Sequence, residues 1–255
     1  MTASNPRIAL VTGASRGLGR SAALKLAEQG ADVILTYKSN REEAQAVVRR
    51  IEALGRRAVA LPLDVADSAG FDDFAARVEA ALASTWQRER FDHLVNNAGT
   101  GEHASFAETT EAQFDRLVNV HLKATFFLTQ KLLPLIEDGG RIVNTSSGLA
   151  RFTLPGYAAY AAMKGGIEVL TRYMAKELAA RGIAVNTIAP GAIETDFGGG
   201  AVRDDRQLNA QIASVTAMGR VGLPDDIGGA VAALLSDGNR WITGQRIEVS
   251  GGMML

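Results

Sequence analysis

Tyr160 and Lys164 are the residues whose types and spacing point most directly to chemistry. They lie four positions apart in the segment GYAAYAAMKGG, where the alanines and a preceding proline predict the start of a helix. That spacing places both side chains on one face of the helix, one turn apart. A phenol beside an ammonium group is a usable acid/base unit, because a fixed cation favours the phenolate and lowers a phenol pKa of about 10. The segment therefore predicts proton transfer at Tyr160.

This pair is weak support when it is taken alone. Lowering a tyrosine pKa by about 3 units needs roughly 4 kcal/mol of differential stabilisation. One lysine on a wet surface would not supply that, whereas a lysine with a second cation in a closed site could. An ordinary amphipathic helix that carries a tyrosine and a lysine by chance is the alternative, so the rest of the chain has to support the chemistry.

The elements that would position this pair alternate regularly between strands and helices. Parallel strands with crossover helices form a doubly wound sheet, and ligands of such sheets bind at the carboxyl ends of the strands. No linker or repeat marks a domain boundary. The sequence therefore predicts a single Rossmann-type α/β domain over residues 1–255, with a parallel sheet of about seven strands. The expected strands cover residues 7–12, 31–36, 57–63, 91–98, 140–144, 183–189 and 245–249.

Three glycines follow the first expected strand, at Gly13, Gly17 and Gly19. Glycines at a strand-to-helix turn let a phosphate approach the backbone N–H groups of the helix N-terminus. The spacing is G-x-x-x-G-x-G rather than the commonest dinucleotide fingerprint, and a tight connection without a ligand is the alternative. The position after the first strand of an alternating pattern favours dinucleotide binding.

The end of the second expected strand indicates which dinucleotide binds. A fold that selects NAD usually places an acidic residue there, on the ribose 2′-hydroxyl. Residues 37–41 instead read YKSNR, and Arg16 in the glycine turn adds a further cation nearby. Cations and hydroxyls suit a 2′-phosphate, so NADP(H) is favoured over NAD(H). A solvated loop is the alternative, and a capping box from Ser39 to Glu42 would account for Ser39.

Other strand ends carry polar residues as well. Asn96 and Asn97 end the fourth expected strand, and such asparagines can fix a loop by side-chain hydrogen bonds or simply form a turn. Ser147 follows the fifth strand, and Pro190 to Thr195 follows the sixth. All of these would meet at one edge of the sheet.

Taken together, these motifs resemble the short-chain dehydrogenase/reductase family, and in particular its members that act as NADP-dependent 3-oxoacyl-[acyl-carrier-protein] reductases. The resemblance covers essentially the whole chain, and the order and spacing of the motifs make it specific. The matching stretches are Thr12 to Gly19, Asp64, Asn96 to Gly99, Asn119, Ser147, Tyr160 to Lys164, and Pro190 to Thr195.

The resemblance implies four catalytic residues. Tyr160 is the general acid/base for the substrate oxygen, and Lys164 lowers its pKa and holds the nicotinamide ribose. The oxidised nicotinamide would be the second cation. Ser147, thirteen residues before the tyrosine, hydrogen-bonds the substrate oxygen in preference to Ser146. Asn119 holds a water that links Lys164 to solvent.

Cofactor contacts carry over from the family in the same way, along the pyrophosphate, the adenosine and the nicotinamide. No metal is expected. The implied cofactor-binding residues are Gly13, Ser15, Arg16, Gly17, Leu18, Gly19, Tyr37, Lys38, Ser39, Asp64, Val65, Asn96, Ala98, Gly99, Tyr160, Lys164, Pro190, Gly191, Ile193 and Thr195.

The expected reaction is hydride transfer between NADP(H) and a ketone or secondary alcohol. Residues 100–106, 148–157 and 195–218 would wall the substrate site, the last as a lid, and their apolar side chains suit a small, moderately apolar substrate. A non-catalytic dinucleotide sensor on the same fold is the alternative of another class. The histidines lie outside the motifs, so structural or surface roles are expected, with His103 the best candidate for a substrate neighbour.

A 3-oxoacyl-[acyl-carrier-protein] reductase is the alternative within the family. Docking an acidic carrier needs cations near the site entrance, and the resemblance implies them just before the fifth strand and late in the tyrosine helix. Residues 135–139 read LIEDG here, whereas Arg181 remains and also suits a helix C-terminus. We therefore predict a preference for free small substrates over carrier-bound ones.

Composition narrows the partners and the compartment. Hydrophobic residues make up 47% of the chain, and a net charge of −1 gives no strong field for nucleic acid or an anionic membrane. The lack of cysteine excludes thiolate chemistry and cysteine-based metal sites. No signal peptide or membrane-spanning stretch is evident, so the cytoplasm is expected. Long helices over 110–134 and 157–181 would pair across a two-fold axis, as the resemblance implies for a homotetramer, with a monomer as the alternative.

Overall fold

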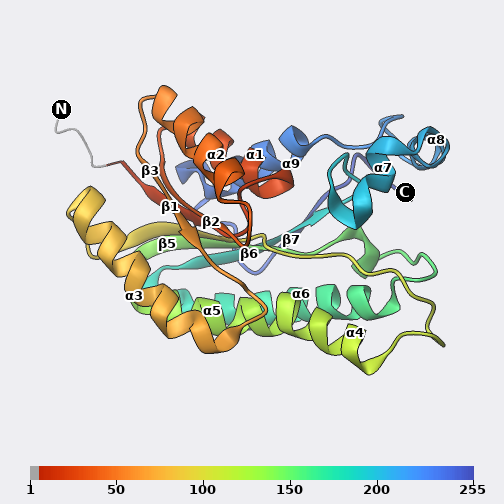
Figure 1. Cartoon of the computed structure of the whole chain (residues 1–255), viewed down its shortest axis with the longest axis horizontal. Helices are drawn as coiled ribbons and strands as arrows, with labels where there is room; N and C mark the ends of the chain where they lie inside the picture. Colours follow the sequence, from red (N-terminus) through yellow and green to blue (C-terminus); the bar gives the residue numbers. More distant parts are fainter. Residues whose placement is uncertain (1–5) are drawn as a thin grey trace.

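Seven strands pair into one parallel sheet in the computed structural model, which describes residues 6–255. Their order across the sheet is β3-β2-β1-β4-β5-β6-β7, so the predicted doubly wound fold is confirmed (Figure 1). The strands are β1 (Ile8–Val11), β2 (Asp32–Tyr37), β3 (Ala58–Pro62), β4 (Phe91–Asn96), β5 (Ile136–Thr145), β6 (Ala184–Pro190) and β7 (Arg246–Val249).

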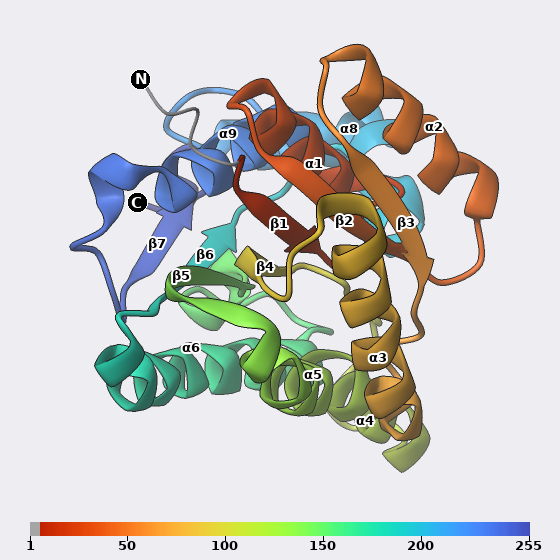
Figure 2. The same ribbon diagram turned by 90° about the vertical axis from the view of Figure 1, so that its left-hand side faces the viewer.

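Helices cover both faces of the sheet, which is why the central strands are apolar without alternation. One face carries α1 (Gly17–Glu28), α2 (Arg41–Ala53) and α9 (Pro224–Leu235), and the other carries α3 (Phe71–Ala81), α5 (Ala124–Leu132) and α6 (Ala158–Leu178) (Figure 2). Every residue of β1 and of β6 is buried. The core therefore forms two layers, one on each side of the sheet.

The chain reverses its direction across the sheet at β1. β1 pairs with β2 on one side and with β4 on the other, and Val11 is in register with both Leu35 and Val95. A crevice forms at such a switch point, outside the carboxyl ends of the strands. The glycine turn after β1 and the segment after β4 consequently lie next to each other.

The helix expected over 110–134 is not a continuous α-helix. It begins as predicted, with a capping box between Thr110 and Gln113 ahead of α4 (Glu111–Leu117). A π-helical turn, Val118–Lys123, then precedes α5. Such single π-turns are rare and often lie at functional sites, and the apolar pattern over 110–134 did not reveal this one. It holds Asn119 and His121.

The start of α2 also differs from expectation. Asn40, rather than Ser39, caps this helix, because its side-chain oxygen accepts a hydrogen bond of 3.2 Å from the backbone N–H of Glu43. The predicted capping box is therefore wrong by one residue, and it does not account for Ser39, which is exposed.

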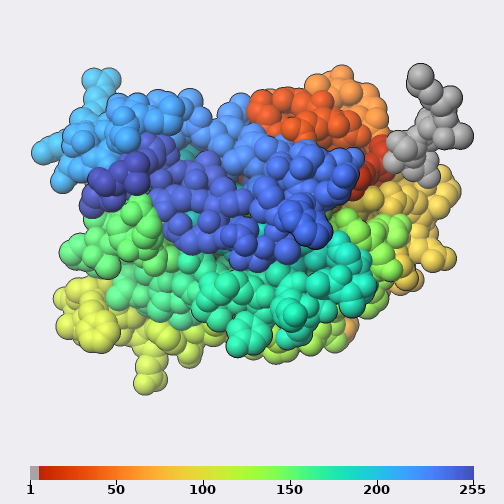
Figure 3. Space-filling view, turned by 180° about the vertical axis from the view of Figure 1, so that it is seen from behind, coloured from red at the N-terminus to blue at the C-terminus, as the bar shows by residue number. Residues whose placement is uncertain are grey.

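The lid, residues 195–218, lies beyond the carboxyl end of β6. It contains a 3-10 turn (Phe197–Gly200) and two short helices, α7 (Ala201–Asp204) and α8 (Arg206–Ser214). The C-terminal segment runs beside it, since the Ala217 N–H donates to the Gly252 carbonyl at 3.2 Å (Figure 3). Among residues 6–255, no helix is long and apolar enough to cross a membrane.

Candidate active site

The predicted site residues come together at the carboxyl edge of the sheet. The segments after β1, β4, β5 and β6 all end there, and α6 starts there with Tyr160 in its first turn. The long helix thus presents its N-terminal end to the carboxyl ends of the strands.

Tyr160 and Lys164 lie side by side and are almost completely buried. Their exposed fractions are 7% and 4%, and the Lys164 Nζ lies 5.5 Å from the centre of the Tyr160 ring. Lys164 also donates a hydrogen bond of 2.7 Å to the Thr145 carbonyl. The i, i+4 spacing on α6 therefore produces the predicted pair inside the protein rather than on its surface.

Burial controls the proton affinities of both groups. It raises the pKa of Tyr160 above its ordinary value, although a hydrogen bond with the Ser147 hydroxyl acts in the opposite direction. It lowers the pKa of Lys164 to about 7. The expectation that Lys164 lowers the Tyr160 pKa is therefore not met by the protein's own groups, because the loss of hydration dominates and only the Ser147 hydrogen bond opposes it. A buried lysine with such a lowered pKa, at the carboxyl edge of the sheet, is a candidate functional residue.

Of the two adjacent serines, Ser147 is the one that faces Tyr160. Its hydroxyl also accepts a hydrogen bond of 3.2 Å from the Leu149 N–H. The Ser146 hydroxyl is bonded elsewhere, 2.7 Å from a Glu168 carboxylate oxygen and 3.2 Å from the Lys164 carbonyl. Because these two bonds tie the Ser146 hydroxyl to α6, it is not placed to contact a substrate.

The π-helical turn contributes a residue that sequence reasoning did not assign to the site. The His121 ring meets the Tyr160 ring edge-on, with centres 5.2 Å apart, and its Nε2 lies 2.8 Å from the Thr100 carbonyl. Nε2 therefore carries the proton, and Nδ1 has no hydrogen-bond partner within residues 6–255. Burial and the Lys164 charge lower the His121 pKa to about 3, so the ring is neutral. The signal in the sequence that could have assigned His121 to the site was its position two residues after Asn119.

The glycine turn is locked to the segment after β4. A side chain at Gly13 would place its Cβ 2.9 Å from the Ala98 Cα, and one at Gly19 would come within 2.5 Å of the Asn97 amide nitrogen. The Asn97 side chain donates to the Thr12 carbonyl at 3.0 Å and to the Gly13 carbonyl at 3.3 Å. Asn97 therefore fixes a turn by side-chain hydrogen bonds, as expected for this motif, although the turn is the one after β1.

The start of α1 fits a dinucleotide pyrophosphate. Arg16 caps the helix with extended backbone and without a side-chain hydrogen bond, and the first turn contains no acidic residue. The first N–H groups of the helix are consequently available to an anion, whose approach is eased by Gly17, with its φ of 57° and no side chain. Ser15 and Leu18, also predicted here, are half-buried beside it.

Cations lie where a 2′-phosphate is expected. Lys38 is exposed after β2 and forms an ion pair of 2.9 Å with Asp64, which follows β3. Burial by itself would raise the pKa of the Asp64 carboxyl, but Lys38 holds that pKa below its ordinary value. Arg16 lies 4.0 Å from Asp196 in the lid. These cations therefore fit a phosphate. A bound phosphate would compete for them with the carboxylates of Asp64 and Asp196.

The Asn96 side chain points away from the predicted cofactor ribose. Its amide nitrogen donates to Thr129 and to Asn144, both at 2.9 Å, in the core between β4, β5 and α5. Because buried amides require such partners, only the backbone of Asn96 is available to a ligand. The other residues predicted to border the cofactor lie at or just after the carboxyl ends of β3, β4 and β6: Val65, Ala98, Gly99, Pro190, Gly191, Ile193 and Thr195.

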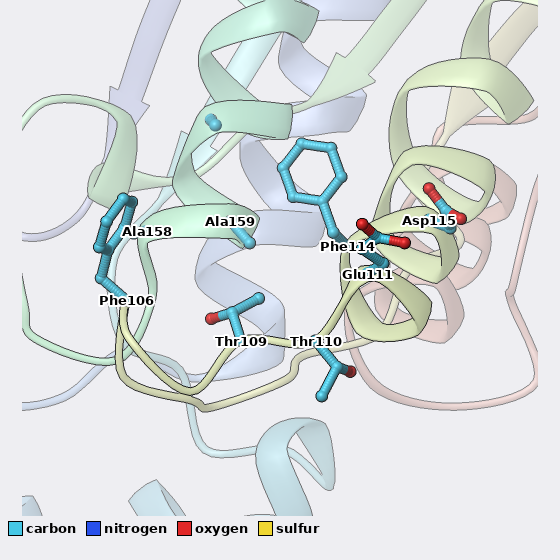
Figure 4. Close-up of a pocket in the computed structure, with 9 residues that line it drawn as sticks. Phe106, Thr109, Thr110, Glu111, Phe114, Asp115, Ala158 and Ala159 are labelled. Atoms are coloured by element: carbon cyan, nitrogen blue, oxygen red, sulfur yellow. The ribbon is translucent and has the colours of Figure 1, made fainter.

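A hollow lies beside the site rather than over the tyrosine. A groove of about 400 Å³ opens between α4 and the start of α6 (Figure 4). Its walls are formed by Phe106, Thr109, Thr110, Glu111, Phe114, Asp115, Ala158, Ala159 and Ala162. Phe106 is 88% exposed there, so it does not contribute to the substrate wall that was expected over 100–106. His103 is also exposed and packs edge-on against Tyr157, with ring centres 5.1 Å apart.

Comparisons with known proteins agree with this geometry. A family model described as enoyl-(acyl carrier protein) reductase matches residues 13–254. The chain is 41% identical over 249 residues to a 3-oxoacyl-[acyl-carrier-protein] reductase FabG of Staphylococcus aureus (strain Mu50), covering 97% of this chain and 98% of the relative.

Solved structures extend the similarity to ketoreductases. The promiscuous reductase LugOII, which catalyses keto-reduction at C1 during lugdunomycin biosynthesis, is 40% identical with a TM-score of 0.92 and 98% of each chain covered. The angucycline C-6 ketoreductase LanV with bound NADP is 36% identical with a TM-score of 0.92, covering 97% of this chain and 95% of that one.

Proposed function

The chain belongs to the short-chain dehydrogenase/reductase family, and on that premise we propose which of its residues carry out the reaction. It is an NADP(H)-dependent oxidoreductase that acts on a ketone or the corresponding secondary alcohol. When bound, the nicotinamide supplies or accepts the hydride. The observation that carries the proposal is the buried pair of Tyr160 and Lys164 beside Ser147.

Tyr160 is the proton donor in ketone reduction. Burial keeps its phenol protonated at neutral pH, so the proton is available to the substrate oxygen as negative charge develops there. Ser147 hydrogen-bonds that oxygen and orients it. The phenolate left on Tyr160 is stabilised by the Lys164 ammonium, which in turn holds its proton more firmly beside an anion. Asn119, in the π-helical turn, holds the water through which Lys164 is reprotonated.

Backbone and cations hold the cofactor along the carboxyl edge of the sheet. The glycine turn and the start of α1 bind the pyrophosphate, and Lys38, Ser39 and Arg16 bind the 2′-phosphate next to Tyr37. Asp64 and Val65 border the adenine, Asn96 to Gly99 border the ribose, and Pro190 to Thr195 border the nicotinamide. Lys164 also holds the nicotinamide ribose. The lid closes over the substrate, within a single domain.

We propose that the substrate is a free, small and moderately apolar carbonyl compound. Arg181, the cation retained from the carrier-protein pattern, donates a hydrogen bond of 2.8 Å to Asp138 and is therefore neutralised. Arg181 is also too far from the catalytic residues of its own chain to lie at the entrance of their site. Arg181 lies 21 residues beyond Tyr160, and a helix of that length spans about 30 Å.

Carrier-bound 3-oxoacyl thioesters are the second candidate, because a relative of 41% identity carries that name. NADPH consumption with a free 3-oxoacyl thioester and with its carrier-bound form decides between them. We expect the free substrate to be turned over with comparable or higher kcat/KM. A strong carrier-bound advantage that disappears at high salt would overturn this expectation, because it would reveal electrostatic docking.

A panel of free ketones with NADPH tests whether the protein is an enzyme. Turnover of several ketones, with NADPH preferred to NADH, is the expected result. Tight NADPH binding without turnover on any of them would instead indicate the sensor alternative.

We also propose a homotetramer in the cytoplasm. Several large apolar side chains of α4, α5 and α6 are exposed on one face, where a second copy would cover them: Phe114 (42%), Phe126 (45%), Phe127 (40%), Val169 (46%) and Tyr173 (65%). Light scattering at micromolar concentration tests the assembly. A mass near 26.9 kDa, that of one chain, would contradict it.

A further inference from the structure

Phe197, at the start of the lid, packs directly on the catalytic tyrosine. The two ring centres lie 5.8 Å apart with the ring planes at 58°, a geometry that aromatic pairs favour. Phe197 is nevertheless 45% exposed. Burying a phenylalanine ring normally stabilises a protein, so this exposure forgoes part of that stabilisation. A large apolar surface therefore stands in solvent beside the reacting phenol.

Gly101 shapes the space that the Phe197 ring occupies. A Cβ at this position would lie 2.7 and 2.8 Å from two carbons of the Phe197 ring, which is shorter than a van der Waals contact between carbon atoms. The loop after β4 thus leaves a flat slot for a six-membered ring between Gly101 and Tyr160. A side chain of any other type at position 101 would push the ring off the tyrosine.

Three consecutive glycines after Phe197 allow that ring to be re-aimed. Gly198, Gly199 and Gly200 have φ values of 62°, 78° and 83°, a conformation that other residues adopt only at a cost. A Cβ at Gly198 or Gly199 would meet nothing within 4 Å, so the glycines serve the backbone and not close packing. Arg203 spans this hinge by pairing with both Asp196 and Asp204.

We propose that Phe197 makes this enzyme selective for carbonyl substrates that carry a planar aromatic ring, which packs against Phe197 beside the Tyr160 phenol. The inference rests on the proposed function and names its substrate class. A flat ring presents its whole face to Phe197, whereas a saturated ring is puckered and makes fewer close contacts. The His103–Tyr157 pair supplies a second aromatic surface at the rim.

Two ketones with one carbon skeleton test this selectivity. In 2-tetralone the ring next to the ketone-bearing ring is aromatic, in 2-decalone it is saturated, and in neither is the carbonyl conjugated to it. We expect the wild-type enzyme to prefer 2-tetralone in kcat/KM, and Phe197→Ala to reduce that preference about 5- to 10-fold. Phe197→Leu should reduce it partly, and Phe197→Tyr should retain it. Phe106→Ala, at an equally aromatic but outward-facing position, should leave it unchanged.

The contact with Gly101 provides an independent check. Gly101→Ala should reduce the preference in the wild-type background but not in Phe197→Ala, because the clash it creates is with the ring. Additive effects of the two substitutions, or a preference in Phe197→Ala within twofold of wild type, would overturn the inference.

Binding separates this inference from the proposed function. Calorimetric titration of 2-naphthol into the NADP⁺-loaded enzyme should show at least fivefold weaker affinity in Phe197→Ala than in wild type. If the wild type reduces neither of these ketones nor any ketone of the panel, the proposed function fails, and the titration then decides the inference alone. Equal 2-naphthol affinity in the two proteins would overturn it.

Discussion

The two edges of the sheet treat a buried charge in opposite ways. At the amino edge, Asp32 is fully buried at the start of β2 and accepts hydrogen bonds from Arg56, Arg57 and Trp86, at 2.8–3.3 Å. At the carboxyl edge, Lys164 is almost as deeply buried, yet its hydrogen bond goes to the neutral Thr145 carbonyl. The carboxylate one turn further along α6, Glu168, is bonded to Arg246 at 2.7 Å instead.

The proton affinities follow from these surroundings. Burial by itself would raise the Asp32 pKa, but its partners more than compensate and hold that pKa below the ordinary value. Burial lowers the Lys164 pKa to about 7, with nothing to offset it. A buried charge with all its partners stabilises the fold, whereas one left without a counter-charge is costly and marks the place where chemistry is done.

The largest effect is expected at the carboxyl edge. Tyr160→Phe removes the proton donor but keeps the ring that packs against His121, so kcat should fall about 100- to 10,000-fold. The midpoint of thermal unfolding and the NADPH dissociation constant should stay close to wild type. Steady-state kinetics with a good ketone substrate, beside fluorescence titration with NADPH, measure both. Retention of most activity would mean that another group supplies the proton.

The opposite outcome is expected at the amino edge. Asp32→Asn leaves Arg56 and Arg57 without their counter-charge and should lower the free energy of unfolding by about 2–4 kcal/mol. Because the Asp32 pKa lies below its unfolded value, the stabilisation is present above that value and is lost as pH falls through the folded pKa. Urea unfolding at neutral and acidic pH measures this difference. The value of kcat below the unfolding transition should be unchanged, and a large loss of kcat would erase the distinction between the two edges.

A smaller effect is expected where the carboxyl edge meets solvent. Lys38→Ala should weaken NADPH binding about 10-fold and NADH binding much less, because it removes a cation from the 2′-phosphate and releases Asp64 beside it. Lys176→Ala, at an exposed position late in α6, is the matched control. Fluorescence titration with both cofactors measures the ratio. Equal weakening for NADPH and NADH would place the 2′-phosphate elsewhere.

The sequence was informative where local rules decide the outcome. Apolar runs and the glycine turn predicted the carboxyl ends of the strands to within about two residues, because strand length and backbone chemistry depend on neighbouring residues. The start of β5 was missed, since this strand begins at Ile136 and not at the predicted residue 140. The i, i+4 spacing of Tyr160 and Lys164 predicted their contact, because helix geometry alone determines it. These features sufficed to bring the candidate residues to one edge of the sheet.

Features that depend on distant partners were not predictable in this way. Asn96 lies in a motif, but its side chain turns into the core because Thr129 and Asn144 satisfy it there. His121 joins the site because a π-helical turn rotates it toward Tyr160. Trp86 lies in a polar, charged stretch of sequence, yet it is buried, and its indole N–H donates a hydrogen bond of 2.8 Å to the distant Asp32 carboxylate.

The stability of Lys164→Met as a function of pH tests the central contrast most directly. With a folded pKa of about 7 and an ordinary value of 10.5, Lys164 destabilises the fold fully below pH 7, and this penalty disappears as pH rises to about 10.5. Without added NADP(H), Lys164→Met should therefore unfold a few degrees above wild type at pH 7, and the gap should close toward pH 10.5, while turnover is lost at every pH. A variant that unfolds below wild type at pH 7, with a gap that does not change with pH, would contradict the account.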